Sequence, residues 1–157
     1  MKLVILSDIH GNYQRLVNTV FAEGDADAFV FLGDGLREIE RLQDEQPELK
    51  IYAVRGNCDV ACFAPHEAIT AFGGLMVLYT HGHLYGVKSG LDELAIAAKA
   101  QDIDIALYGH THCAAHQIIE GVHLFNPGAL SGMRGDAFYG VITIEQGVPH
   151  FTHKQAK

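Results

Sequence analysis

The chain has 157 residues, of which 48% are hydrophobic, and this is enough to bury the core of one domain. It contains no apolar run of about 18 residues, which excludes a membrane-spanning helix, and its formal net charge is −8. Such an acidic chain repels polyanions, so we expect no stable complex with nucleic acid. The apolar run at the N-terminus ends at Asp8, too early for a signal peptide, and we therefore expect a single cytoplasmic domain over residues 1–157.

Short apolar runs recur along the chain, and each predicts a buried strand. Every run is followed at once by a polar or glycine-containing segment that carries Asp, Asn or His. In chain order the runs occupy residues 3–6, 28–32, 51–54, 75–79, 104–108 and 122–125.

Helical periodicity separates several of these runs. The predicted helices occupy residues 12–23, 36–45 and 89–101. Asn12 is placed to cap the first helix, and Ser89 and Asp92 have the spacing of a capping box at the start of the third. Gly-Gly at 73–74 and Glu-Gly at 120–121 favour hairpin turns. The pattern is that of an α/β fold with a partly antiparallel sheet.

The polar residues after the strands should share one edge of the fold, because ligands of α/β proteins bind outside the carboxyl ends of the strands. On an extended chain residues i and i+2 point the same way, so Asp8 and His10 could hold one ion, as could His110 and His112. The residues expected at this edge are Asp8, His10, Asp34, Asn57, His81, His110 and His112.

This set of side chains has the chemistry of a metal centre. Imidazole mixed with carboxylate suits borderline divalent ions such as manganese, iron, zinc or nickel. Seven ligands are too many for one ion. Two ions about 3.5–4 Å apart would accommodate them, which is the arrangement used for phosphoryl hydrolysis.

The order of the motifs resembles a known family. The motifs are DIHGN at 8–12, GDG at 33–35, GNCD at 56–59, HGH at 81–83 and GHTH at 109–112. Together they resemble the calcineurin-like metallophosphoesterases, especially the small bacterial and archaeal phosphodiesterases that have GNCD. The resemblance implies a four-layered α/β/β/α sandwich of two mixed sheets.

The resemblance also implies roles for individual residues. One metal would be held by Asp8, His10, Asp34 and His112. The other would be held by Asp34, Asn57, His81 and His110. Asp34, Asn57 and His81 are accordingly the predicted catalytic residues. A hydroxide bridging two divalent ions would attack a small or flexible phosphodiester, with manganese preferred over nickel, iron, zinc or magnesium.

Three further residues are candidate substrate contacts: Arg55, His83 and Arg134. The protein phosphatases of this superfamily have a histidine where this chain has Cys58. A neutral thiol is a poor hydrogen-bond donor, so we expect little help to a poor leaving group. His83 is a candidate replacement for that acid, or a residue that only shapes its loop.

Two rival functions stay open. The first is a phosphomonoesterase acting on proteins or nucleotides, although few cationic side chains lie near the motifs. The second is a non-catalytic scaffold with this fold, although such relatives have lost ligand residues that are present here. A homo-oligomer is also left open.

Overall fold

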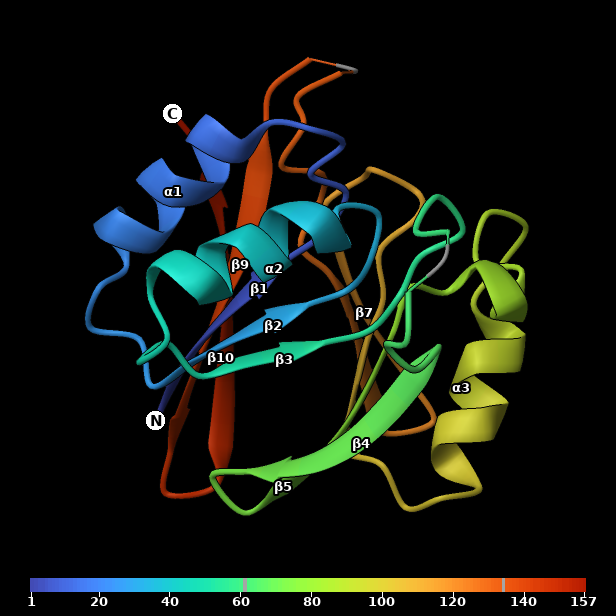
Figure 1. Cartoon of the computed structure of the whole chain (residues 1–157). Helices are drawn as coiled ribbons and strands as arrows, with labels where there is room; N and C mark the ends of the chain where they lie inside the picture. Colours follow the sequence, from blue (N-terminus) through green and yellow to red (C-terminus); the bar gives the residue numbers. More distant parts are fainter. Residues whose placement is uncertain (61, 134) are drawn as a thin grey trace.

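The computed structural model describes residues 1–60, 62–133 and 135–157, and these contain two five-stranded sheets (Figure 1). The first sheet has the order β10-β9-β1-β2-β3. Its strands are β1 (Lys2–Leu6), β2 (Ala28–Phe31), β3 (Ile51–Ala53), β9 (Phe138–Glu145) and β10 (Val148–Gln155). The second sheet has the order β4-β5-β6-β8-β7. Its strands are β4 (Glu67–Phe72), β5 (Leu75–Thr80), β6 (Ile105–Leu107), β7 (Ala115–Ile119) and β8 (Val122–Asn126).

The helices cover the outer faces of the two sheets. Helices α1 (Tyr13–Ala22) and α2 (Leu36–Glu45) lie against the first sheet, and α3 (Asp92–Lys99) lies on the far side of the second (Figure 1). One apolar cluster, with Ile5 and Phe125, fills the space between the sheets. Separate clusters lie beneath α1 and α2 and beneath α3. The predicted α/β/β/α sandwich of two mixed sheets is therefore confirmed.

Parallel pairing brings the polar ends of the strands together. In the first sheet β1 pairs with β2, and β2 with β3, all parallel. In the second sheet β5 pairs with β6, and β6 with β8, in the same way. Backbone hydrogen bonds from Asp8 to Gly33 (3.0 Å) and from Gly109 to His81 (3.1 Å) join the loops that follow these strands. The loops therefore meet at one edge of the sandwich.

The helix starts agree only in part with the sequence pattern. Asn12 caps α1, because its Oδ1 accepts a hydrogen bond of 3.2 Å from the backbone N–H of Arg15. The capping box predicted for α3 is wrong: Leu91 occupies the N-cap, and no side chain caps this helix. Ser89 instead donates its backbone N–H to Gly86, so it belongs to the turn that precedes α3.

Both predicted hairpin turns are confirmed. Gly73 and Gly74 join β4 to β5, and Glu120 and Gly121 join β7 to β8, all with positive φ as a type I′ turn requires. A third hairpin, β9–β10, was not predicted. Within the described residues no helix combines the length and the apolar character needed to cross a membrane.

Candidate metal centre

The loops after five parallel strands deliver the predicted ligand residues to one place. Those from the first sheet are Asp8, His10, Asp34 and Asn57, and those from the second are His81, His110 and His112. Each of the seven has a nitrogen or oxygen atom within 4 Å of another member of the set. The structure therefore brings all seven together.

Asp8 lies at the centre of one group of ligand atoms. Its Oδ1 is 3.0 Å from Nε2 of His112 and 3.6 Å from Nε2 of His10. The two imidazole nitrogens are 3.4 Å apart. One ligand atom from each of these three residues lies within 4.8 Å of the ligand atoms of the other two. This spacing would allow the three atoms to bind the same ion.

Asp34 and His81 form the second group. Oδ2 of Asp34 lies 3.4 Å from Nε2 of His81 and 3.8 Å from Nε2 of His10, so it stands between the two groups. Nε2 of His81 is also 3.1 Å from Oδ1 of Asn57 and 3.2 Å from Nδ1 of His110. Asp34 is thus the carboxylate placed to serve two ions.

The backbone at this centre is not extended. Asp8, His10, Asp34, His110 and His112 all have φ between 44° and 65°, in the left-handed region. The expectation that residues i and i+2 converge because the chain is extended is therefore wrong. The side chains converge because each loop turns through left-handed residues, a conformation that costs about 1–2 kcal/mol per residue outside glycine. Strain of this kind is found at functional sites.

Both carboxylates are buried yet remain ionised. Burial disfavours the charged form of Asp8, but hydrogen bonding to His10 and His112 outweighs it and holds the pKa of Asp8 well below its usual range. Burial also acts against ionisation of Asp34, but the hydrogen bond and charge of His81 lower its pKa to about 2. Two negative charges are thus held in a pocket of the protein interior.

The histidines respond to these carboxylates. Hydrogen bonding to Asp8 raises the pKa of His10. Burial acts to lower the pKa of His81, but its hydrogen bond to Asp34 and the charge of Asp8 raise it overall. Burial, followed by the charge of His81, lowers the pKa of His110 to about 4. The carboxylates therefore favour the protonated forms of His10 and His81, and binding of a metal ion would require these histidines to be neutral.

The residues present fit divalent metal ions. Oδ1 of Asp8 is fully buried and lies beside the imidazole nitrogens of His10 and His112. Burying a carboxylate is costly unless it is paired, and a divalent cation would provide a strong partner. The neighbouring ligand atoms lie 3.0–3.8 Å apart, which is compatible with their sharing ions through bonds of about 2.0–2.2 Å.

Asp59 joins two of the loops and is absent from the residues predicted for the site, because motif spacing does not reveal hydrogen bonds to another loop. Its Oδ2 accepts hydrogen bonds from the backbone N–H groups of Asp34 (2.7 Å) and Gly56 (2.9 Å). Its Oδ1 accepts from Gly35 (2.9 Å) and Leu36 (3.0 Å). Asp59 thereby caps α2 and fixes the loop after β2 against the loop after β3.

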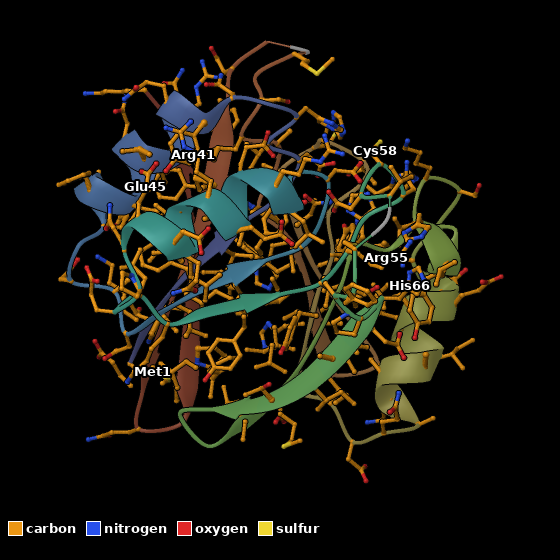
Figure 2. The ribbon with its side chains drawn as sticks, in the orientation of Figure 1. Met1, Arg41, Glu45, Arg55, Cys58 and His66 are labelled. Carbon is orange, nitrogen blue, oxygen red and sulfur yellow. The ribbon has the colours of Figure 1, made fainter. Side chains whose placement is uncertain are left out.

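Cys58 is exposed at the tip of its loop (Figure 2). Its backbone N–H donates to Oδ1 of Asp34 (2.8 Å), and its thiol lies within 4.8 Å of ligand atoms of His10 and Asp34. Burial, and then hydrogen bonding to Asp34, raise the pKa of the thiol to about 11. A thiol held neutral in this way is a weak hydrogen-bond donor.

A cleft of about 360 Å³ opens from the metal centre toward the start of α2. His10, Asp34 and Cys58 line it together with Arg37 and Val60. The cleft therefore joins ligand residues of the centre to the first turn of α2.

The remaining predicted contacts lie on the other side of the centre. His83 begins the 3-10 helix η1 (His83–Tyr85), and its ring centroid is 5.4 Å from that of His81. Burial, and then the charges of His81 and His66, lower the pKa of His83. Arg55 follows β3 and is half-buried. Arg134 lies outside the described residues.

Comparison with known proteins identifies the family of this fold and site. The model of the calcineurin-like phosphoesterase superfamily domain matches residues 1–147. The chain belongs to this superfamily. The predicted family and the predicted class of phosphoric ester hydrolase are therefore confirmed.

Individual members of the superfamily align over most of the chain. It is 32% identical over 149 residues to the probable metallophosphoesterase YsnB of Bacillus subtilis, covering 92% of this chain and 85% of YsnB. It is 34% identical over 169 residues to the phosphodiesterase YfcE of Escherichia coli K12, covering 90% of this chain and 87% of YfcE.

Solved structures share the fold. A predicted phosphoesterase from Streptococcus pneumoniae superposes with a TM-score of 0.79 at 24% identity, covering 98% of this chain and 97% of the other. Vps29 from Entamoeba histolytica, solved with zinc, superposes with a TM-score of 0.75 at 17% identity, covering 99% of each chain. At these identities the likeness concerns the fold alone.

Proposed function

We propose that this chain hydrolyses phosphodiesters with the help of two divalent metal ions. The observation that carries the proposal is the shared position of Asp34 between two groups of ligand atoms. Membership of the superfamily, and the similarity to YfcE, a phosphodiesterase, support the same reaction class.

The ligands divide between the two ions as follows. Asp8, His10, Asp34 and His112 would hold one ion, and Asp34, Asn57, His81 and His110 the other. When bound, such ions lower the pKa of water and neutralise phosphoryl oxygens. Asp34 would position both ions, and Asn57 adds a neutral oxygen that keeps the site's negative charge low.

The mixture of imidazole, carboxylate and amide favours manganese among the divalent ions, with nickel, iron, zinc and magnesium as alternatives. The family match over residues 1–147 supports a single metallophosphoesterase domain. We also propose a cytoplasmic location.

A diester suits the site better than a monoester. A monoester carries one more negative charge and needs additional cations. Among the described residues that line the cleft, Arg37 is the one permanent cation, and it is accompanied by the acidic residues Glu38 and Glu40. Arg55 and Lys88 act electrostatically on His83 and His110, respectively. The cleft beside His10 and Asp34 leaves room for an organic group of a diester.

A panel of phosphoesters tests the proposal. The purified protein is loaded separately with manganese, nickel, magnesium or zinc and assayed with bis(p-nitrophenyl) phosphate and p-nitrophenyl phosphate. We expect the diester to be cleaved faster, with manganese most effective. A faster monoester reaction would favour the phosphatase alternative. A metal-loaded protein that cleaves no phosphoester would favour a scaffold, the alternative raised by the structural likeness to Vps29.

A further inference from the structure

Arg55, His66 and His83 lie beside the metal centre and are here called the Arg–His cluster, in which Arg55 carries a fixed positive charge and the two histidines are hydrogen-bonding groups. The ring of His83 lies 6.1 Å from that of His110, and the ring of His66 lies 5.7 Å from that of His83. The three imidazoles thus lead from a metal-ligand residue outward to His66, which is exposed.

Backbone contacts hold Arg55 beside this row. The backbone N–H of Arg55 donates to the carbonyl of Pro65 (2.9 Å), which places Arg55 next to His66 at the base of the loop (Figure 2). The hydroxyl of Thr80 donates to the carbonyl of His66 (3.1 Å), which ties His66 to the end of β5. The cluster is therefore built on the same strand ends as the metal centre.

The side chains of the cluster are not engaged by acidic partners. Among the described residues Arg55 forms no salt bridge, and Nδ1 of His83 has no hydrogen-bond partner. The neighbouring carboxylate of Glu67 is bonded instead by the hydroxyl of Tyr85 (2.5 Å). In a chain with a net charge of −8, a half-buried arginine that forms no salt bridge with the described residues and lies beside two histidines is an unusual local feature.

We propose that the Arg–His cluster binds a second anionic group of the substrate, so that the preferred substrate is a phosphodiester that also carries a phosphate on one of its organic groups. The proposal rests on the phosphodiesterase function proposed above. Arg55 supplies a planar set of donors that matches phosphate oxygens, and His66 and His83 add further donors. The cleft near Arg37 takes the organic group on the other side.

A matched pair of substrates tests this subsite. Thymidine 5′-(p-nitrophenyl phosphate) and its 3′-phosphorylated derivative release the same nitrophenol and differ by one phosphate. With manganese-loaded protein we expect kcat/KM to be roughly tenfold higher for the 3′-phosphorylated substrate, the effect of one charge-assisted hydrogen bond. The ratio should fall as salt is added, because salt screens charges at a partly exposed site.

Variants show whether the Arg–His cluster causes the difference in kcat/KM between the two substrates. Arg55→Met and His66→Gln should each move the ratio toward 1, and His66→Gln alters an exposed side chain that the fold does not need. Lys50→Gln, which removes an exposed positive charge at the start of β3, should leave the ratio unchanged. A ratio near 1 in the unaltered protein, or equal losses on both substrates in Arg55→Met and His66→Gln, would overturn the proposal.

Binding of the products separates this inference from the function on which it rests. Calorimetry with manganese-loaded protein compares thymidine 3′,5′-bisphosphate with thymidine 5′-phosphate. If the bisphosphate binds more tightly than the monophosphate, and this difference is lost in His66→Gln, the subsite is supported. If neither diester is cleaved at the same time, only the phosphodiesterase function is excluded. Turnover of both diesters with equal product affinities would leave that function intact and exclude the subsite.

Discussion

The carboxylate of Asp59 accepts a hydrogen bond of 2.7 Å from the backbone N–H of Asp34, and it accepts hydrogen bonds from three further backbone N–H groups. This contact fixes the loop that presents the carboxylate shared by the two proposed ions. Close approach of the loops adds to it, because a side chain at Gly56 would collide with the carboxylate of Asp34.

Replacing Asp59 should therefore weaken metal binding as well as stability. In Asp59→Ala four backbone donors lose a charged acceptor, and we expect a loss of about 3 kcal/mol in the free energy of unfolding. Manganese affinity should fall about 10- to 100-fold, as for other residues that orient metal ligands. Urea unfolding and calorimetry measure the two effects. Asp44→Ala, at an exposed position of α2, is the control, and unchanged manganese affinity in Asp59→Ala would contradict this role.

The neutral thiol of Cys58 leads to a prediction about leaving groups. Diesters of nitrophenol should be cleaved well and simple alkyl diesters poorly, since no strong acid replaces the histidine of the protein phosphatases. Cys58→Ala should keep most of the activity on nitrophenyl diesters, whereas Asp34→Ala should lose at least about 100-fold. Steady-state rates decide the matter. Equal rates on both diester classes, or equal losses in the two variants, would refute the argument.

Glu23 should make the stability of the protein depend on pH well away from the metal centre. Burial disfavours its charged form, but hydrogen bonds from Lys154, Lys2 and Tyr139 outweigh it and lower its pKa to about 2. Because the pKa is lower in the folded than in the unfolded state, the stabilisation is complete above about pH 4.5 and is lost as the pH falls toward 2.

Replacing Glu23 by glutamine measures the contribution of its charge to the free energy of unfolding, which is on the order of 3 kcal/mol. Metal-free protein and its Glu23→Gln variant are unfolded with urea at pH 6.5 and at pH 3. We expect the unaltered protein to be the more stable at pH 6.5 and the difference to shrink at pH 3. A difference that is the same at both pH values would show that Glu23 does not act through its charge.

The left-handed backbone at His110 predicts that replacement by glycine leaves a more stable protein than replacement by alanine, the reverse of the usual order. His110→Ala and His110→Gly both remove the imidazole, so both should lose activity. They differ in a Cβ at a residue with φ of 65°. Glycine tolerates this φ without strain, so the glycine variant should be about 1 kcal/mol more stable than the alanine variant. Thermal unfolding of metal-free protein tests the order, and greater stability of the alanine variant would contradict it.

Much of the architecture could be predicted from residue patterns because each buried strand ends in a polar motif. The short runs before Asp8, Asp34, Asn57, His81 and His110 were recognisable as strands. The β9–β10 hairpin was not, because neither strand ends in such a motif and Pro149 within β10 argues against a strand. Its turn at Gln146 and Gly147 has the positive φ values of a hairpin, but Gln is not a residue that signals such a turn.

The convergence of the seven candidate ligand residues could be predicted from the sequence, whereas the contacts around them could not. Motif spacing identifies side chains that have metal chemistry, but it does not reveal contacts between residues far apart in the chain. Asp59 accepts hydrogen bonds from four backbone N–H groups, and His66 lies near His83, only because separate loops pack together. The motifs do not point to His66, because its neighbour His83 is 17 positions away along the chain (83 minus 66) and follows another strand.

The proposed ligands come from both sheets, and this has a mechanical consequence. Asp8 and His10 follow a strand of the first sheet, whereas His112 follows a strand of the second. An ion held by all three would link the two sheets at one edge of the sandwich. It would act as a reversible cross-link that closes a loop of about a hundred residues. Chelation should then release that edge first, and amide hydrogens of the loops after β1 and β6 should exchange faster while those beneath α3 remain protected.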